Sequence, residues 1–470
     1  MPAHTEDIRY HSALAITRTL RAHGHQAFFA GGCVRDLLLG LAPKDFDVAT
    51  SATPEAVLAL FPKTHAVGAH FGVILVCDEA TNITTEVATF RHDGAYSDGR
   101  RPDAVRFSSS PEEDVLRRDF TINGMLLDPL AFDQTHDAET ATLDLVGGQQ
   151  DLATRTLRAI GNPATRFAED KLRMLRAIRF AARLDLTIEP RTFAAIQHAA
   201  SGIHQVSLER IRDELTLMLT EGHARRAFDL LLDSGLLAHV LPEAVRMVGV
   251  QQPPEFHPEG DVWVHTLLLL EHLPPHPSPT LAWGALLHDI GKPATYQPPD
   301  PRLPNDRIRF NGHVEVGVRV SEVILQRLRF SNDDTAQILA LVKNHMRFGD
   351  IRAMKQSTLK RFLRLPRFEE HLELHRLDCS SCHNNLELYH FAKQHFEASP
   401  AETLQPKPLL TGRDLIQDGY RPSPQFKPML ELAEDAQLEA SIHTSSEALT
   451  LIHQHFGPPP PSSATKSKME

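Results

Sequence analysis

Two glycines and two aspartates near the start of the chain have residue types and a spacing suited to phosphate chemistry. Gly31 and Gly32 follow the apolar segment 28–30, and Asp45 and Asp47 come after a short spacer. A Gly-Gly turn lets the backbone approach a ligand closely, and N–H groups at the start of a following helix favour phosphate oxygens. Aspartates two positions apart lie on one face of a strand, where they offer hard oxygen ligands to Mg²⁺ bound jointly with substrate phosphates. Such a site can support in-line displacement by a hydroxyl, with the metal ions stabilising the leaving pyrophosphate.

Two further residues would complete this site. Arg35 follows the glycine pair and offers a forked, permanently charged donor to phosphate. A third carboxylate is expected on a neighbouring strand, and Glu86 is the candidate because it lies in the β-like segment 83–90. Asp78 is the alternative, but it stands at the expected end of a strand.

The sequence Gly-Gly-Cys-Val-Arg-Asp at 31–36, followed by Lys-Asp-Phe-Asp at 44–47, resembles the head motif of the nucleotidyltransferase superfamily. The similar branch holds the bacterial and eukaryotic CCA-adding enzymes and the bacterial poly(A) polymerases. The resemblance implies that CTP and ATP are substrates and that the 3′ end of tRNA is the acceptor. We expect Asp45, Asp47 and Glu86 to be catalytic, with Asp45 and Asp47 binding Mg²⁺.

Residues 117–123 look like the second motif of this family, which reads the ribose and separates ribonucleotides from deoxyribonucleotides. Asp119 and Asn123 can hydrogen-bond to hydroxyl groups, and Arg118 can hold a phosphate. Asp144 and the Gly-Gly that follows it resemble the third motif, a hinge-like element, and a simple turn is the alternative. Gly32, Arg35, Arg118, Asp119 and Asn123 are therefore expected to bind nucleotide.

A second informative segment, 169–180, has the spacing of a helix that could read a base. Asp170, Arg173 and Arg176 recur every third residue and would lie along one side of that helix. An aspartate accepts and an arginine donates hydrogen bonds, so together they can match a Watson–Crick edge, while Arg176 and Arg179 can reach the triphosphate. In the resembled family this Asp-x-x-Arg pair selects CTP or ATP without a nucleic-acid template. The alternative is an amphipathic helix with weak salt bridges.

The same region is locally basic in an acidic protein. Residues 155–191 contain nine Arg and Lys against four Asp and Glu, whereas the whole chain has a formal net charge of −11. Phosphate neutralisation dominates affinity for nucleic acids, so this segment is the expected RNA-binding surface. The segment 207–214 resembles the fifth motif of the family, in which Ser207 would cap a structural helix.

Histidines and aspartates in the second half of the chain form a second set suited to metal binding. Its specific part is an adjacent His-Asp pair in Leu-Leu-His-Asp-Ile-Gly-Lys, with further His and Asp residues before and after it on expected helices. This order resembles the HD phosphohydrolase superfamily, which implies a divalent transition metal that activates water. One metal is expected on His265, His288, Asp289 and Asp378, with a second supported by His313 and His345.

Cys379, Cys382 and His383 match a haem-attachment pattern. That chemistry follows export, and the N-terminus has no basic patch followed by an apolar core, so chance is the better explanation. A zinc site would need two further ligands.

The elements that must position these residues change character near residue 155. Short apolar strands and turns precede it, and helical spacing follows it. We predict an α+β chain with a small mixed β-sheet in a nucleotidyltransferase head and predominantly helical domains after it. The expected domains are the head at 1–150, a base-selecting and RNA-binding neck at 151–250, an HD domain at 251–398, a helical segment at 399–456 and a disordered tail at 457–470.

Composition limits the classes of protein. The chain has 470 residues, four cysteines and no run approaching the roughly 20 apolar residues of a membrane span. So few cysteines do not make a disulfide framework, and a reducing cytoplasm fits. We expect a cytoplasmic monomer or homodimer with no membrane partner.

Narrower and different activities stay open at this point. The chain could add only CC, only A or a poly(A) tail, but polymerases of this family tend to carry Arg and Lys in the stretch that is 67–73 here, which has none. The loop 92–102 has the full length typical of relatives that switch from CTP to ATP. An alternative of another class is an HD phosphohydrolase with an inactive head.

Overall fold

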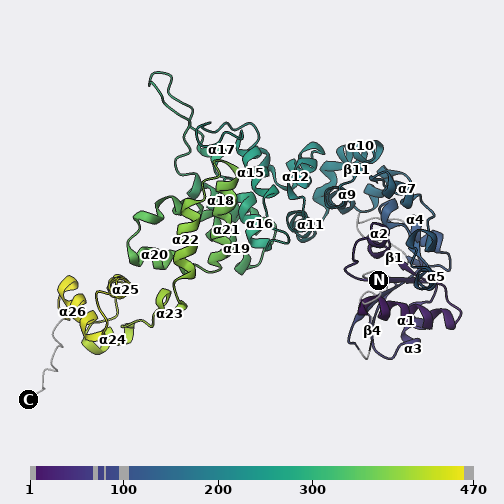
Figure 1. Ribbon diagram of the computed structural model, residues 1–470, viewed down its shortest axis with the longest axis horizontal. Coiled ribbons are helices and arrows are strands. Elements are labelled where there is room, and N and C mark those ends of the chain that lie inside the picture. Colours follow the sequence, from purple (N-terminus) through teal and green to yellow (C-terminus); the bar gives the residue numbers. More distant parts are fainter. Residues whose placement is uncertain (1–6, 67–71, 79–80, 95–104, 460–470) are drawn as a thin grey trace, which may run out of the picture. The chain divides into compact units, whose positions relative to one another are not determined.

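The computed structural model describes residues 7–66, 72–78, 81–94 and 105–459. The chain divides into two compact units, one formed by residues 1–246 with 327–329 and the other by 247–326 with 330–470. The class is α+β, as predicted, because the sheet lies in the first unit and the second is helical (Figure 1). The division at 246/247 lies close to the expected boundary at 250/251, and the other expected boundaries stay predictions.

The first unit contains a seven-stranded sheet in the order β3-β4-β5-β2-β1-β8-β9. Neighbouring strands are antiparallel except β2 and β5, which run parallel with Val48 beside Val87. The sheet is therefore mixed, and the segments 28–30, 73–76 and 83–90 form strands as expected. Its strands are β1 (Ala27–Ala30), β2 (Asp47–Thr50), β3 (Thr64–His65), β4 (Val73–Cys77), β5 (Thr84–Thr89), β8 (Leu126–Leu127) and β9 (Thr142–Leu143).

Aromatic packing fixes the strand that carries the aspartates. Tyr10 of α1 (Ile8–Ala22) meets the rings of Phe29, Phe46 and Phe132 edge to face, with centroids 5.8, 5.5 and 6.1 Å away. Phe46 is buried, and it stands between the two aspartates of the head motif. Anchoring this ring in the core therefore holds the residues on either side of it. The other helices here are α2 (Gly32–Leu38), α3 (Pro54–Leu60), α4 (Pro111–Leu116), α5 (Pro129–Thr135), α6 (Ala138–Ala141) and α7 (Gly148–Ala153).

Helices follow the sheet in the first unit. The amphipathic α9 packs against α11 and α12, and its buried face includes Leu175, Ile178 and Ala181. Ser207 occupies the predicted N-cap position of α11, but its side chain makes no capping hydrogen bond. The helices are α8 (Pro163–Glu169), α9 (Leu172–Arg183), α10 (Pro190–Ala199), α11 (Leu208–Thr220), α12 (Ala224–Asp233), α13 (Leu237–Val240) and α14 (Pro242–Val245).

Asp170 does not lie on the helix that the spacing predicted. It ends α8 with an extended backbone (φ −140°, ψ 109°), and α9 begins only at Leu172. The three-residue spacing of charged residues therefore spans the end of one helix and the start of the next. Short elements complete this unit: β6 (Arg91–Asp93) pairs with β7 (Val105–Phe107), and β10 (Thr156–Leu157) with β11 (Thr187–Ile188).

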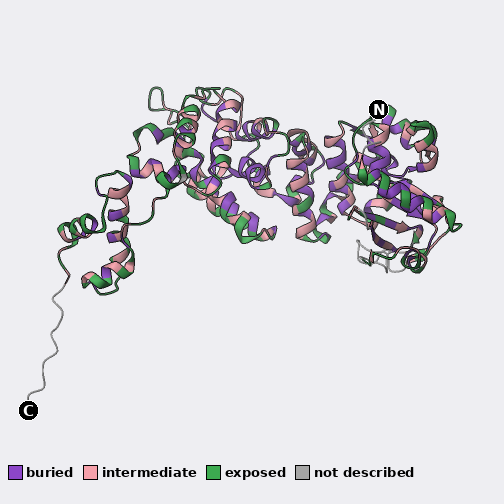
Figure 2. Ribbon diagram, turned by 60° about the horizontal axis from the view of Figure 1, so that its bottom comes forward, coloured by how far each residue is buried: buried purple, intermediate pink, exposed green. Residues whose placement is uncertain are grey.

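The second unit is built from helices around α15 and α16, whose side chains are buried on nearly all sides (Figure 2). Its last three helices enclose a core of their own that includes Leu415, Met429 and Ile452. The helices are α15 (Val262–Glu271), α16 (Pro279–Leu287), α17 (Lys292–Thr295), α18 (His313–Arg327), α19 (Asn332–Asn344), α20 (Gln356–Leu363), α21 (Phe368–Ser381), α22 (Glu387–Glu397), α23 (Ala401–Leu404), α24 (Gly412–Asp418), α25 (Phe426–Leu438) and α26 (Ser445–Phe456). Among the described helices, none has the length and apolar character needed to cross a membrane.

Some predictions fall on parts of the chain outside the described residues. Most of the loop 92–102, most of the stretch 67–73 and most of the tail 457–470 lie there. The expectations for these segments stay predictions from sequence.

Gly291 offers a test of how the second unit holds its histidines. A Cβ added there would lie 2.1 Å from the carbonyl oxygen of His313 and 2.5 Å from the amide nitrogen of Gly317, both in α18. We expect Gly291→Ala to push α18 away and to destabilise this unit by about 1–3 kcal/mol. Calorimetry of the full chain would measure the loss. Gly349→Ala, where a Cβ meets nothing within 4 Å, is the matched control. Equal unfolding midpoints for the two variants would contradict the expectation.

Candidate active site

Three carboxylates gather at one end of the parallel strand pair. Asp47 begins β2, and the parallel register places Glu86 of β5 beside it, while Asp45 lies just before the strand. Burial, followed by the charges of Glu86 and Asp45, raises the pKa of Asp47 to about 7. Burial and the charge of Asp45 likewise raise the pKa of Glu86. Like charges held this close favour a bound cation, and carboxylate oxygens are the ligands that suit Mg²⁺.

The alternative third carboxylate lies elsewhere. Asp78 follows the end of β4, where its side chain accepts hydrogen bonds from the amide and the hydroxyl of Thr81 at 2.9 and 3.0 Å. It therefore stabilises a turn. The carboxylates whose charges raise the pKa of Asp47 are Glu86 and Asp45, and Asp78 is not among them. The geometry therefore favours Glu86 as the third member of the cluster.

A cavity of about 530 Å³ in the first unit opens over these aspartates. Its walls come from the sheet end of the unit and from the helices that follow. Predicted residues in the walls are Gly32, Arg35, Asp45, Asp47, Arg118, Asp119, Asn123, Asp170, Arg173 and Arg176. Residues in the walls that sequence reasoning did not assign to the site include Lys44, Arg117, Phe180, Arg183, Arg210 and Glu221. Lys44, Arg117, Phe180 and Arg210 stood inside recognised motifs or segments, whereas no local signal marked Arg183 or Glu221.

Hydrogen bonds hold the expected ribose-reading group in place. Asn123 donates to Asp119 at 3.2 Å and accepts from Arg35 at 2.7 Å. Arg176 Nε donates to the other oxygen of Asp119 at 2.9 Å. Burial alone would raise the pKa of Asp119, but the charge and hydrogen bonds of Arg176 and Asn123 lower it below its usual value. The carboxylate is therefore ionised at neutral pH and rigidly oriented.

The phosphate side of the cavity is formed by arginines with fixed partners. Arg118 donates to Asp114 at 2.9 Å, and its Nη1 lies 3.4 Å from where a Cβ of Gly31 would stand. Gly31 has φ 74°, a conformation that glycine adopts without strain. A larger residue there would be strained, and its side chain would meet the Arg118 guanidinium.

Asp170 and Arg173, the pair predicted to read the base, line the cavity and are held by hydrogen bonds to other residues of the protein. Arg173 donates to Glu169 at 2.6 Å and to the carbonyl oxygen of Arg117 at 3.0 Å. Asp170 accepts from the amide of Leu172 at 3.0 Å and from Arg210 at 2.8 Å. Both side chains therefore have set orientations before any nucleotide arrives.

Arg179 does not occupy the position expected of a triphosphate ligand. Its guanidinium is buried and donates to Glu214 at 2.7 Å and to Glu221 at 3.1 Å. It is absent from the cavity walls, and its charge is offset by these two carboxylates of the α11 region. The geometry gives Arg179 a role in packing α9 against α11, which corrects the expectation from spacing.

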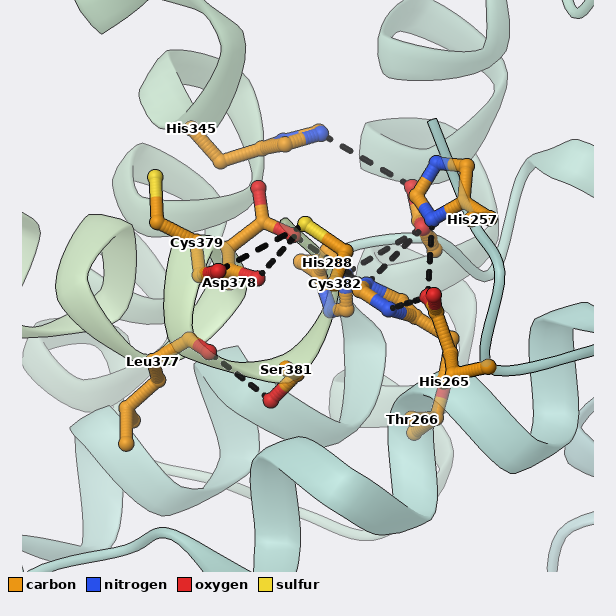
Figure 3. Close-up of polar contacts among 12 residues, drawn as sticks. His257, His265, Thr266, His288, His345, Leu377, Asp378, Cys379, Ser381 and Cys382 are labelled. Atoms are coloured by element: carbon orange, nitrogen blue, oxygen red, sulfur yellow. Dashed lines mark hydrogen bonds and ion pairs between the residues drawn. The ribbon is translucent and has the colours of Figure 1, made fainter. Parts of the chain in front are cut away.

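The second unit brings together all six predicted HD residues, of which Figure 3 labels His265, His288, His345 and Asp378. His265 Nε2 lies 3.1 Å from Asp378 and 3.4 Å from His288 Nε2. The two carboxylate oxygens of Asp289 face different histidines, with Oδ2 3.2 Å from His288 and Oδ1 3.7 and 3.8 Å from His313 and His345. Asp289 therefore lies between two groups of candidate ligands. It was expected to belong to the first group alone.

The histidine rings are oriented as metal ligands. In His288, Nδ1 lies 2.9 Å from the carbonyl oxygen of Ala285. In His313 it lies 2.9 Å from the carbonyl oxygen of Phe310, and in His345 it lies 2.7 Å from that of Val342. Nδ1 therefore carries the proton in the neutral rings, and Nε2 presents a lone pair. His313 Nε2 and His345 Nε2 then face each other at 3.4 Å as two acceptors, an arrangement that a cation between them would stabilise.

Several residues of this site were not found from the sequence. Glu259 Oε1 lies 2.7 Å from Nδ1 of His265 and 2.9 Å from Nδ1 of His257, so it orients a predicted ligand. A second cavity, of about 580 Å³, is lined by His257, Lys292 and Arg307 together with ligands of the site. Cys382 also lines it, whereas Cys379 is buried against His375. No spacing pattern pointed to Glu259, because its contact with His265 depends on the loop before α15.

Comparison with known families identifies three segments in turn. Residues 27–158 match the poly(A) polymerase head domain, residues 185–247 match the family described as the probable RNA and SrmB-binding site of polymerase A, and residues 261–379 match the HD domain. The order of these matches, a polymerase head followed by an RNA-binding segment and an HD domain, agrees with the resemblance found in the sequence. The carboxylate cluster lies in the first matched segment, and all six HD residues lie in the third.

Individual proteins similar to this chain agree with these matches. The chain is 43% identical to the CCA-adding enzyme of Geobacillus kaustophilus and 42% identical to that of Geobacillus sp. strain WCH70, in each case over 49% of this chain and 54% of the relative. The sequence match thus spans about half the length of these curated relatives. The structure is similar to that of the Bacillus stearothermophilus CCA-adding enzyme in complex with CTP, with a TM-score of 0.71 and 26% identity over 95% of this chain and 98% of that one.

The raised pKa of Asp47 predicts how the metal-free protein responds to pH. A carboxyl whose pKa is raised by folding contributes stability that is present at low pH and is lost as pH rises through about 7. Asp47→Asn removes this loss. Thermal unfolding without metal measures the effect. We expect the unfolding midpoint of the wild type to fall relative to that of Asp47→Asn as pH rises through about 7.

Mg²⁺ supplies the second half of this test. It should restore the stability of the wild type above the pKa but leave Asp47→Asn unchanged. Asp78→Asn, which keeps an acceptor for the Thr81 turn, should behave as the wild type does. Parallel pH profiles for the wild type and Asp47→Asn would contradict the assignment.

Proposed function

We propose that this protein adds CCA to the 3′ end of tRNA without a nucleic-acid template, using CTP and ATP. The observation that carries the proposal is the single cavity that is lined both by Asp45 and Asp47 of the carboxylate cluster and by the Asp170–Arg173 pair, whereas Glu86 is not among its lining residues. A metal-binding transfer site and a base-reading pair made of protein side chains would thus serve one bound nucleotide. The family match and the CCA-adding relatives support the same activity.

The hydrogen-bonding pattern of Asp170 and Arg173 accounts for the two nucleotides. Cytosine and adenine each present an exocyclic amino donor, whereas uracil and guanine present a carbonyl acceptor there. Asp170 accepts and Arg173 donates, so the pair suits an amino group next to an unprotonated ring nitrogen. That combination occurs on the Watson–Crick edges of cytosine and adenine.

The remaining residues hold the nucleotide and the reacting groups. Mg²⁺ on Asp45, Asp47 and Glu86 would activate the 3′ hydroxyl of the RNA and stabilise the leaving pyrophosphate. Arg118 and Arg176 face the cavity with donors suited to phosphate, and Asp119 and Asn123 offer groups to the ribose hydroxyls. Gly32 opens α2, where backbone amides are available to the phosphates. The basic segment 155–191 would bind the RNA backbone.

We propose the HD site as a metal-dependent phosphohydrolase centre that removes phosphate groups from RNA ends. His265, His288, Asp289 and Asp378 would hold one divalent transition metal, and His313 and His345 would support a second near Asp289. Arg307 in the cavity walls supplies positive charge for a phosphate substrate, whereas Lys292 pairs with Asp289 at 2.7 Å. We further propose a cytoplasmic location and a monomeric or homodimeric state.

Narrower activities differ from this proposal only in where addition stops. The absence of Arg and Lys in 67–73 favours tRNA repair over poly(A) synthesis, and the full-length loop 92–102 favours addition of the terminal A. Both arguments rest on sequence.

Stepwise incorporation tests the proposal. Purified protein and Mg²⁺ would receive tRNA transcripts ending before CCA, after C and after CC, each with labelled CTP, ATP or both. We expect addition that stops at CCA, because the protein offers one base-reading site for both nucleotides. A long A tail, or addition confined to C or to A, would replace the proposal with the corresponding narrower enzyme.

Crossed variants separate the two sites. Asp45→Ala should lower nucleotide addition by at least ~100-fold while leaving hydrolysis of bis-para-nitrophenyl phosphate intact, since even loss of an outer ligand of a metal commonly costs 10–100-fold. Asp289→Asn should do the reverse. If Asp45→Ala retains addition, the carboxylate cluster is not the metal site.

A further inference from the structure

Arg210 contacts the predicted base-reading aspartate from outside. It lies in the first turn of α11, and its Nη2 donates to Asp170 Oδ2 at 2.8 Å, with Nη1 3.4 Å from Oδ1. The two residues are forty positions apart in the sequence, and both line the cavity over the carboxylate cluster. Arg210 was not among the residues assigned to this site from the sequence.

Asp170 needs such a partner because of where it stands in the chain. It lies between α8 and α9 with an extended backbone, so neither helix fixes its side chain. The amide of Leu172 binds Oδ1 at 3.0 Å, and on its own this single contact would leave the carboxylate free to swing about that bond. Arg210 adds a second contact on Oδ2, which fixes the plane of the carboxylate.

These contacts leave room for a base. A carboxylate has about four acceptor positions, and the Leu172 amide and Arg210 take the principal ones on the protein side. Oδ2, which accepts from Arg210 alone among these contacts, keeps an acceptor position for an amino group in the cavity. If the carboxylate could rotate, it would also accept a hydrogen bond from the ring N–H of uracil or guanine in a shifted nucleotide. The site would then separate CTP and ATP less well from UTP and GTP.

Arg210 is not required to hold the helices together. Arg179 of α9 binds Glu214 at 2.7 Å and Glu221 at 3.1 Å, and apolar residues of α9 and α11 are buried between these helices. These contacts remain when Arg210 is changed, so its effect can be separated from that of helix packing.

We propose that Arg210 is a positioning residue that sets nucleotide selectivity by fixing the carboxylate plane of Asp170. The proposal rests on the function proposed above and adds a residue that determines its specificity. It acts on the preference for CTP and ATP over UTP and GTP, and its effect passes through Asp170.

The test is the kcat/KM for each of the four nucleotides on tRNA transcripts ending before CCA and after CC. Arg210→Ala should lower the ratio of CTP to UTP, and of ATP to GTP, by roughly 10- to 100-fold, the discrimination typical of one good base contact. The loss should appear chiefly as a raised KM for the correct nucleotide. Arg210→Lys, which restores a point charge, should recover part of the ratio.

Two further variants make the result specific. Arg212→Ala removes the same charge from the same helix, but Arg212 pairs with Asp213 and should leave both ratios unchanged. Arg210→Gln keeps an amide donor at similar reach and serves if the alanine variant unfolds. If the Arg210 variants lower kcat/KM for all four nucleotides equally, or leave the ratios unchanged, Arg210 does not position Asp170. If the wild type adds no nucleotide at all, the function itself is wrong and this inference fails with it.

Discussion

The parallel register of β2 on β5 places Asp47 beside Glu86, with Asp45 two positions before Asp47 in the chain, and the first unit depends on this concentration of negative charge. The arginines nearby offset it only in part, because they have carboxylates of their own: Arg35 pairs with Asp36, Arg118 with Asp114 and Arg176 with Asp119. The charge of the cluster is therefore left for metal ions, and the same arginines keep donors directed at the cavity where phosphates would lie. Metal and triphosphate thus complete the site together.

The second unit also gathers candidate metal ligands, but most of them are histidines. There, backbone carbonyls and Glu259 hold Nδ1 of four histidines, so that their Nε2 atoms converge on Asp289 and Asp378. Nitrogen and oxygen ligands fixed in this way suit a transition metal, whereas the all-oxygen cluster of the first unit suits Mg²⁺. The two sets of candidate ligands therefore differ in chemistry, and each lies at a cavity of its own.

Much of this arrangement could be predicted from the sequence, because its signals are local. The alternation in 83–90 predicted β5, and the periodicity of 172–182 predicted α9. What failed depended on contacts distant in the chain. Asp170 has helical spacing yet ends α8, and its partner Arg210 is forty residues away. Arg179 has the charge of a phosphate ligand but is buried against carboxylates that only the packing of α11 supplies.

The central claim is that protein side chains read the base in the cavity. Calorimetric titration of the RNA-free protein with CTP, ATP, UTP and GTP in the presence of Mg²⁺ tests it most directly. We predict that CTP and ATP bind at least ~10-fold more tightly than UTP and GTP, because only their Watson–Crick edges present an amino group next to an unprotonated ring nitrogen. The same titration of Asp170→Ala should remove the difference. Equal binding of all four nucleotides to the wild type would contradict the claim.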